Sequence, residues 1–345
     1  MRTASLLLRA ARSAAAAGVG AVALAGAGTF AAAQSARPAG TSSGLTQQRT
    51  FSYDLDDHNH GKARVRVLKV RRNSATHSVS EYTVQTRLFS PDYAKVFTDE
   101  DNTDLVATDT QKNTVYIVAK RTAARTPEEM GIALAKHFMT EYPVLSAIEV
   151  HVSETSWRRV VTDGPHDHSF ERGSDERAVA TVRMSRDALD APDVESRIES
   201  MVVLKTTQSG FEGYLRDRYT LLPETRERCL ATELSASWRY TRQSGAAPLD
   251  YGAVRQAVRR ELQRGLFGPS RGGVYSASLQ ATIYDAGCLV LSAVPDVARI
   301  AIDTPNLHYL PFHTLKQVGE QFEDDVFIPT SEPSGIIHCC VSRPA

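Results

Sequence analysis

The strongest constraint on the fold is a weak internal duplication. Residues 142–150 (YPVLSAIEV) and 294–302 (VPDVARIAI) are 152 positions apart and share a proline and three apolar positions. Around each copy, the periodicity of apolar residues predicts the same order of elements: two strands, two helices and two strands. We therefore expect an α+β fold with two tandem modules, each an antiparallel four-stranded sheet with a helix pair on one face.

Alternation of polar and apolar side chains predicts the strands of both halves. In the first half these strands are residues 63–70, 79–88, 147–152 and 178–184. In the second half they are residues 200–206, 214–222, 232–242 and 297–302. Sheets of this kind have open edges, so the sequence predicts that the protein closes them by pairing with another copy of itself.

Four helices are predicted, two in each half. Residues 106–121 form the first, with Thr108 as the expected N-cap because Gln111 follows at the capping-box position. The next helix has Thr126 as its N-cap, with Glu129 three residues later. The helices of the second half are residues 250–264, with Gly265 as the C-cap, and residues 276–292.

The first 50 residues are typical of a targeting segment rather than of a folded domain. They contain five arginines, no lysine and no acidic residue. This composition favours a mitochondrial presequence, with a secretory signal or a membrane span as alternatives. The C-terminal Ser-Arg-Pro-Ala is not the peroxisomal Ser-Lys-Leu address. We therefore divide the chain into a presequence or disordered segment (1–50) and two modules (51–192 and 193–345).

Charge and motif content exclude several classes of protein. Residues 51–345 carry 35 basic and 40 acidic side chains, which gives no reason to expect nucleic acid as a partner. There is no GxGxxG or GxxxxGKS/T motif to hold a nucleotide, and the four cysteines form no zinc or disulfide pattern. The pairs His58/His60 and His166/His168 each offer two imidazoles, but no third ligand is evident, so we expect no metal site.

Residues 106–120 (VATDTQKNTVYIVAK) resemble a segment of the urate oxidases (uricases), and similar matches extend over residues 58–341. They include Gly61-Lys62, GPHDHSF (164–170), VLKTT (203–207), FEGYLRDRYT (211–220) and ETRER (224–228). Further matches are SASLQAT (276–282), PNLHY (305–309) and PSGII (333–337). The resemblance implies the tunnelling fold, in which two tandem modules per chain close into barrels by oligomerisation and a homotetramer encloses a tunnel.

The resemblance also implies a binding site for urate, a flat purine anion. Arg228 matches a bidentate clamp, Gln280 matches an amide that reads donors and acceptors, and Phe211 matches an aromatic stacking surface. Asp109 and Leu279 match residues that contact the substrate through their backbone, although the family commonly has valine at the leucine position. Taken singly, each of these residues also has an ordinary structural explanation.

For catalysis, Lys62 and Thr108 match a pair that relays a proton from urate, and His308 matches a histidine that extends the relay. Asn306 matches the residue beside the pocket for oxygen and water. His60 stands where the family frequently has tyrosine, which alters the surroundings of the lysine. The resemblance implies a direct reaction of urate with dioxygen and water, without a metal or organic cofactor, that gives 5-hydroxyisourate and hydrogen peroxide.

In the family, Lys62, Thr108 and Asp109 come from one subunit and the remaining binding residues from its neighbour. Two alternatives stay open: another purine or pterin enzyme of this fold, or a catalytically inactive purine-binding descendant. Family members are usually peroxisomal, so the peroxisome is an alternative to the mitochondrial matrix, and secretion is a third. We expect no membrane association in the mature form.

Overall fold

The computed structural model describes residues 53–241 and 249–344. The predicted presequence, residues 1–50, lies outside the described residues, as does Arg242 at the end of one predicted strand. All the elements below belong to one unit, Asp54–Ala345. No helix among the described residues is long and apolar enough to cross a membrane.

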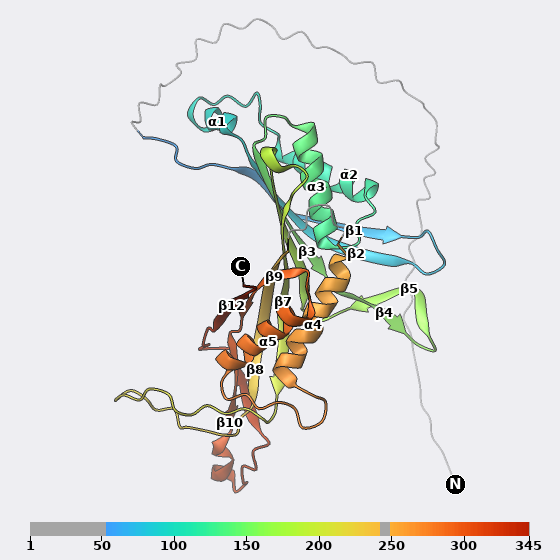
Figure 1. The fold of residues 1–345 in the computed structure, drawn as a ribbon. Coiled ribbons are helices and arrows are strands. Elements are labelled where there is room, and N and C mark those ends of the chain that lie inside the picture. Colours follow the sequence, from blue (N-terminus) through green and yellow to red (C-terminus); the bar gives the residue numbers. More distant parts are fainter. Residues whose placement is uncertain (1–52, 242–248, 345) are drawn as a thin grey trace, which may run out of the picture. The chain divides into compact units, whose positions relative to one another are not determined.

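Ten of the twelve strands in the described residues form one antiparallel sheet (Figure 1). Its first four strands, in spatial order, are β1 (His60–Arg71), β2 (Ser78–Phe89), β3 (Ala147–Thr155) and β6 (Arg177–Ser185). It continues with β7 (Asp193–Lys205), β8 (Leu230–Tyr240), β9 (Val297–Asp303) and β12 (His338–Ser342), while β10 (Asn306–Pro311) pairs with β8 and β11 (Phe327–Thr330). A separate hairpin consists of β4 (Trp157–Val161) and β5 (Pro165–Arg172).

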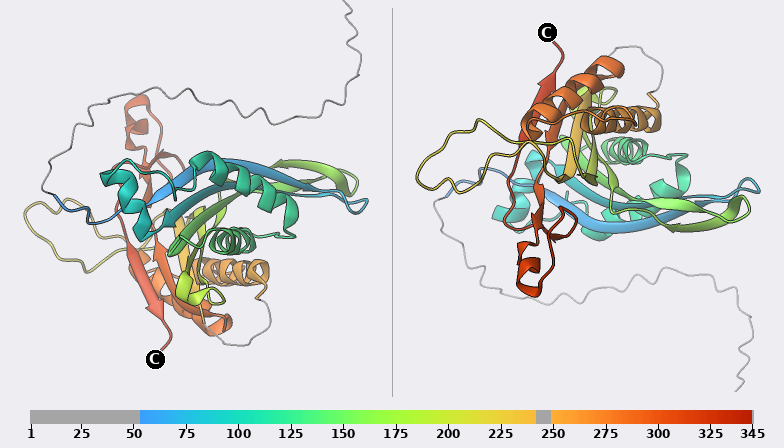
Figure 2. Two further views of the ribbon diagram at one scale, coloured as in Figure 1. Left: turned by 90° about the horizontal axis from the view of Figure 1, so that it is seen from above. Right: turned by 90° about the horizontal axis from the view of Figure 1, so that it is seen from below.

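Two helix pairs pack on this sheet. The pairs are α2 (Thr108–Arg121) with α3 (Pro127–Glu141), and α4 (Tyr251–Phe267) with α5 (Leu279–Ala293). Short helical segments are η1 (Pro91–Tyr93), α1 (Ala94–Thr98), η2 (Arg186–Ala188) and η3 (His313–Val318). Helices α3 and α4, one from each half, lie side by side (Figures 1 and 2). The predicted α+β fold with antiparallel sheets and helix pairs is confirmed, and the two predicted sheets are joined into one through β6 and β7.

The interior consists of two hydrophobic clusters. The first draws its buried residues from positions 65–194 and includes Leu134 and Phe138 of α3. The second draws on positions 198–302 and includes Leu262 of α4 and the fully buried Trp238 of β8. Each cluster therefore belongs to one helix pair and the strands beneath it.

The internal duplication is visible in the backbone. Tyr142 and Val294 follow α3 and α5 as C-caps with almost identical torsion angles, φ −121° and ψ 88° against φ −122° and ψ 87°. The strands that follow bury equivalent residues, with Ile148 and Ile300 both at most 1% exposed. The sequence echo therefore marks the same helix-to-strand connection in both halves.

A buried polar network joins the two halves. The carboxylate of Glu128 in α3 is fully buried and pairs with the guanidinium of Arg255 in α4 at 2.6 Å. The hydroxyl of Ser196 in β7 donates a hydrogen bond to the same carboxylate at 2.5 Å. Breaking a buried ion pair by removing one partner costs about 3–5 kcal/mol, so this network fixes α3 against α4.

Three predicted details are wrong for physical reasons. Ala107, not Thr108, is the N-cap of α2, because the Gln111 side chain is buried and bonds Thr86 and the Val106 carbonyl instead of the helix start. The helix predicted to end at Gly265 continues to Phe267. An added Cβ at Gly265 would lie 2.5 Å from the Cβ of Ala286, so this glycine permits close packing of α4 on α5 rather than ending the helix.

The third wrong detail is the strand predicted at residues 214–222, which is irregular. Leu215 and Leu221 are 95% and 90% exposed, so neither face of this segment has a sheet or core to pack against within the chain. Alternation of apolar residues alone therefore does not produce a strand here.

Candidate active site in two halves

The first half of the candidate site lies where β1 meets α2. Lys62 stands near the start of β1 opposite Thr86 of β2, and a bulge follows it, with Arg64 at φ 58°. Thr108 and Asp109 are the first two residues of α2. The pKa of the Asp109 carboxyl is lowered by its hydrogen bond from Lys112 and, to a smaller extent, by the charge of Lys62. The structure therefore brings the Lys62 charge close to the start of α2.

The hydroxyl of Thr108 is available for chemistry. Thr108 is half-buried at the first position of α2, and its side chain makes no hydrogen bond within the described part of the chain. The N-terminus of a helix carries a partial positive charge and unpaired backbone N–H groups that favour anions. A hydroxyl and an anion-binding backbone are thus presented together beside a lysine.

His60 lies behind this half of the site. Its ring meets the edge of Tyr93 with centroids 6.2 Å apart, and its Nε2 is buried without a partner. Burial lowers the pKa of this imidazole, and a hydrogen bond with the Val106 backbone offsets only part of the effect. A neutral His60 two residues from Lys62 adds no positive charge at neutral pH.

The second half is centred on Phe211 and Arg228. Phe211 pairs with Thr225 through two backbone hydrogen bonds, and the Arg228 backbone N–H donates to the Ser209 carbonyl. These bonds bring the Arg228 guanidinium carbon to 5.3 Å from the centre of the Phe211 ring. The Arg228 Nε is buried without a hydrogen-bond partner, and burial lowers the pKa of the guanidinium. A planar cation with an unused donor beside an aromatic face is suited to a flat anion.

The start of α5 adjoins this pair. Ser276 accepts a backbone hydrogen bond from Gly210 and donates one to Gln208, which ties the segment before α5 to the segment that carries Phe211. Ser278 caps the helix, Leu279 is buried at the first position, and Gln280 is exposed at the second. The amide of Gln280 makes no hydrogen bond to the described residues, so its donor and its acceptor are both unused.

Asn306 and His308 are on β10, whose partner β8 begins two residues after Arg228. Asn306 lies opposite Thr232 of β8, and its backbone N–H donates to the Gly335 carbonyl at 2.9 Å. His308 lies two residues further along the strand, opposite Thr330 of β11. The structure thus groups six of the nine predicted residues, Phe211, Arg228, Leu279, Gln280, Asn306 and His308, at one end of the sheet.

The two halves do not meet within one chain. From β1 to β10 the sheet order contains six strand-to-strand steps, and at about 4.8 Å per step the path across the sheet is roughly 29 Å. Figure 1 shows α2 and β10 at opposite ends of the sheet. A site that uses Lys62 together with Arg228 therefore needs a second copy of the chain.

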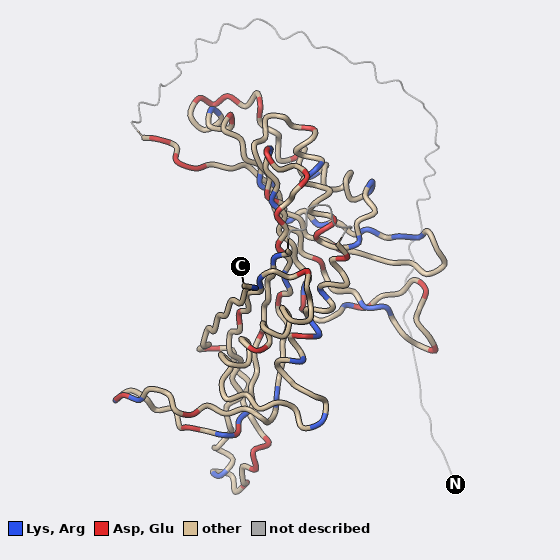
Figure 3. Tube along the Cα trace, in the orientation of Figure 1, with Lys and Arg blue, Asp and Glu red and all other residues tan. Residues whose placement is uncertain are grey.

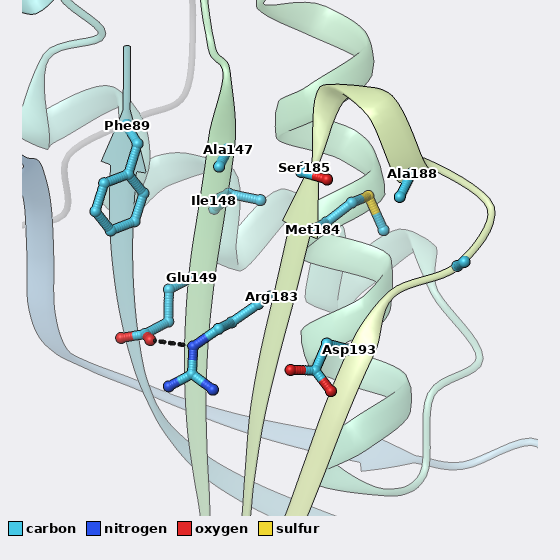
Figure 4. Close-up of a pocket in the computed structure, with 10 residues that line it drawn as sticks. Phe89, Ala147, Ile148, Glu149, Arg183, Met184, Ser185, Ala188 and Asp193 are labelled. Carbon is cyan, nitrogen blue, oxygen red and sulfur yellow. Dashed lines mark hydrogen bonds and ion pairs between the residues drawn. The ribbon is translucent and has the colours of Figure 1, made fainter. Parts of the chain in front are cut away.

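Two cavities of the described chain lie away from the predicted site residues. One of about 390 Å³ opens between β3, β6 and the start of β7 and contains the ion pair of Glu149 with Arg183 at 2.8 Å (Figure 4). Another of about 420 Å³ lies beside α4 and is lined by Glu154 and Arg255. Neither is lined by any of the nine predicted site residues.

One basic run and one pair of histidines stand out among the described residues. The segment from Lys62 to Arg72 carries six basic and no acidic residues, whereas acidic and basic residues are interspersed over most of the rest of the described chain (Figure 3). His166 and His168 of β5 lie with ring centroids 4.7 Å apart, but no group of three or more metal-ligating side chains occurs in residues 53–241 and 249–344. Among the nine predicted site residues, Lys62 and Arg228 are the lysine and the arginine, and Lys62 begins the basic run.

A twisted antiparallel sheet with open edges, two helix pairs on it and half-sites at opposite ends defines a tunnelling-fold protein.

The family model named Uricase matches residues 58–183 and 194–338. The chain is 42% identical over 308 residues to uricase-2 isozyme 2 of Glycine max, which covers 87% of this chain and 98% of that protein. It is 33% identical over 285 residues to the uricase of Oryctolagus cuniculus, covering 82% and 93%. The crystal structure of uricase from Arthrobacter globiformis superimposes with a TM-score of 0.75 at 34% identity and covers 85% of this chain and 96% of that one. The chain belongs to the uricase family.

Proposed function

We propose that this protein oxidises urate at sites formed between two copies of the chain, using the nine residues assigned above. It is a urate oxidase, and the reaction converts urate, dioxygen and water into 5-hydroxyisourate and hydrogen peroxide. The observation that carries the assignment of residues is the Arg228 guanidinium, which lies beside the Phe211 ring with a buried and unused Nε donor.

Binding of urate uses the half-site at the β10 end. The planar anion stacks on Phe211, and the guanidinium of Arg228 donates two parallel hydrogen bonds to a carbonyl oxygen and the neighbouring ring nitrogen. Gln280 pairs with the opposite edge of the purine, where donor and acceptor groups alternate. The substrate thereby supplies the partner that the buried Arg228 donor lacks in the free chain.

Deprotonation uses the half-site at the start of α2 of the neighbouring copy. Thr108 takes a proton from bound urate and passes it to Lys62, which acts as the base, and His308 extends the relay. The urate dianion is rich enough in electrons to pass one to dioxygen directly, so the protein supplies deprotonation, orientation and a dry pocket. Asn306 positions oxygen, and then water, above the purine. Water adds at C5 and two electrons reduce dioxygen to hydrogen peroxide, which balances the reaction.

The oligomer that completes the sites is proposed to be a homotetramer. The open edges of the sheet support this proposal, because β1 has one antiparallel neighbour, β2, within the described chain. Two copies pair to close a barrel, and two such dimers enclose a tunnel. Size-exclusion chromatography with light scattering tests the number of copies, and a stable, active monomer would contradict the shared site.

The decisive experiment is turnover by the purified full chain. We expect loss of the near-ultraviolet absorbance of urate with matching consumption of oxygen and formation of peroxide, unchanged by a chelator. Absence of turnover with intact binding of urate would indicate an inactive purine-binding descendant. Activity that disappears on chelation would overturn the cofactor-free mechanism.

We propose the mitochondrial matrix as the compartment, on the basis of the basic, acid-free first 50 residues. The peroxisome and the secretory route are the alternatives. Imaging of the chain with and without residues 1–50 distinguishes them, because a matrix protein loses its location when the presequence is removed. Unchanged location after removal would refute the proposal.

A further inference from the structure

A second aromatic ring lies against the proposed stacking surface. Tyr214 stacks on Phe211 with ring centroids 4.9 Å apart and planes inclined by 12°. Arg228 lies over Phe211 and Arg216 lies over Tyr214, with guanidinium carbons 5.3 and 5.6 Å from the ring centres. These contacts link four side chains in the order Arg228, Phe211, Tyr214, Arg216, and we call this set the stack.

Because Tyr214 stacks on one face of Phe211, a flat substrate can stack only on the other face. If neighbouring layers are roughly 3.5 Å apart, the Tyr214 ring is displaced sideways by roughly 3.4 Å, the offset arrangement that aromatic pairs prefer. For Arg228 the same separation gives a sideways displacement of roughly 4 Å. The guanidinium therefore lies beside the ring centre rather than over it, so it does not cover the ring.

Tyr214 is held in this place from the outside. Its hydroxyl donates a hydrogen bond to the Leu222 carbonyl. Arg216 Nη1 approaches both that hydroxyl and the Leu222 carbonyl at 3.4 Å. Residues 212–224, which we call the arm, connect Phe211 to Thr225, the two residues of an isolated β-bridge, and these bonds close the arm upon itself. The Tyr214 ring is thus fixed by the arm and supports Phe211.

We propose that Tyr214 is a positioning residue for urate oxidation: its ring supports the rear face of Phe211 and fixes the plane on which urate stacks against Arg228. The inference rests on the proposed function, because it assigns a role within that site. Phe211 is half-exposed, its backbone pairs with Thr225, and its ring contacts Arg228 and Tyr214. Without Tyr214 its ring is free to tilt, and a tilted ring cannot hold the purine in the plane of the guanidinium.

The test compares three substitutions in the full-length protein. Tyr214→Leu removes the stacked ring, and Tyr214→Phe keeps the ring but removes the hydrogen bond to Leu222. Tyr219→Leu is the control, since Tyr219 is on the same arm, contacts Arg218 and does not touch Phe211. The measurements are KM and kcat with urate and, separately, the Kd for urate without oxygen, where binding occurs and turnover does not.

We expect Tyr214→Leu to raise both KM and the anaerobic Kd about 3- to 10-fold, as for loss of an aromatic pair, with a smaller change in kcat. Tyr214→Phe should stay within about 2-fold of the parent protein, and Tyr219→Leu should match it. Unchanged or lowered KM and Kd in Tyr214→Leu, or equal losses in Tyr214→Phe and Tyr214→Leu, would overturn the proposal. A fall in kcat alone would also overturn it.

Two further points keep the test decisive. If Tyr214→Leu does not fold, Arg216→Gln replaces it, because Arg216 is exposed and forms only the outer layer of the stack. That variant should raise the anaerobic Kd about 2-fold, and no change would count against the stack. If the parent protein binds urate but does not oxidise it, the proposed function fails, while the anaerobic Kd values still test the role of Tyr214.

Discussion

Replacing Arg228 by leucine should remove substrate binding and at the same time stabilise the free protein. Its Nε is buried without a partner, and an unsatisfied buried donor costs about 1–3 kcal/mol. Loss of the contact between the guanidinium and the Phe211 ring lowers the free energy of unfolding by about 0.5–1 kcal/mol. The net effect of Arg228→Leu on the free energy of unfolding is therefore a gain of about 1 kcal/mol, or about 2 °C in melting temperature for a chain of this size.

The assay pairs thermal unfolding without urate with anaerobic binding of urate. Arg226→Leu is the matched control, because Arg226 is two residues away, its side chain is 85% exposed, and it pairs with Glu212 on the surface. The control should change the melting temperature by less than about 1 °C and leave binding intact. For Arg228→Leu, loss of a bidentate charged contact predicts at least about a 100-fold rise in Kd. The reasoning would be refuted if Arg228→Leu melted several degrees lower than the parent or bound urate normally.

Three further outcomes are expected. Lys62→Ala and Thr108→Ala should each lower kcat by about 100-fold or more while changing the anaerobic Kd for urate by less than about 3-fold, and equal losses of both would indicate a structural role. Burial raises the pKa of Glu154 to about 7, above its value of about 4.5 in the unfolded chain, so the folded state loses stability as pH rises from about 4.5 through about 7. The free energy of unfolding of Glu154→Gln, relative to that of the parent, should therefore rise by up to about 3 kcal/mol between pH 5 and pH 8. Urea unfolding at the two pH values measures this difference, and a difference that is the same at both would refute the buried-carboxyl explanation. Gly265→Ala places a methyl group 2.5 Å from the Cβ of Ala286 and should lower the free energy of unfolding by about 1–3 kcal/mol in urea unfolding. An unchanged free energy of unfolding would contradict the role of Gly265 in the close packing of α4 on α5.

The pattern of secondary structure could be predicted because it depends on local properties of the chain. The capping box at Thr126 and Glu129 is confirmed, since both of its hydrogen bonds form between residues three positions apart. The helix α3 and the alternating strands β1 and β2 were equally predictable from the sequence, because each presents one apolar face to the first hydrophobic cluster. Where a second element competes for the same atoms, as Thr86 does for Gln111, the local rule failed.

The candidate residues came from resemblance, and their arrangement came from the structure. No spacing in the sequence indicates that Phe211 and Arg228 share a surface, because the contact depends on the bridge between Phe211 and Thr225 and on the return of the arm. Tyr214 was missed as part of the site because its segment was predicted as a strand. The only signal in the sequence was its position three residues after Phe211, within a stretch that matches the family.

By itself, the sequence determined the four main helices, most of the long strands, the duplication and the chemistry available at each position, because these depend on side-chain type and near neighbours. Only the tertiary structure decided that the two duplicated halves join into one sheet through β6 and β7. It also decided that Lys62 lies about six strand steps from Asn306 along that sheet. Those facts depend on pairing between distant segments, and the separation they create is the physical reason that the proposed site needs a second copy of the chain.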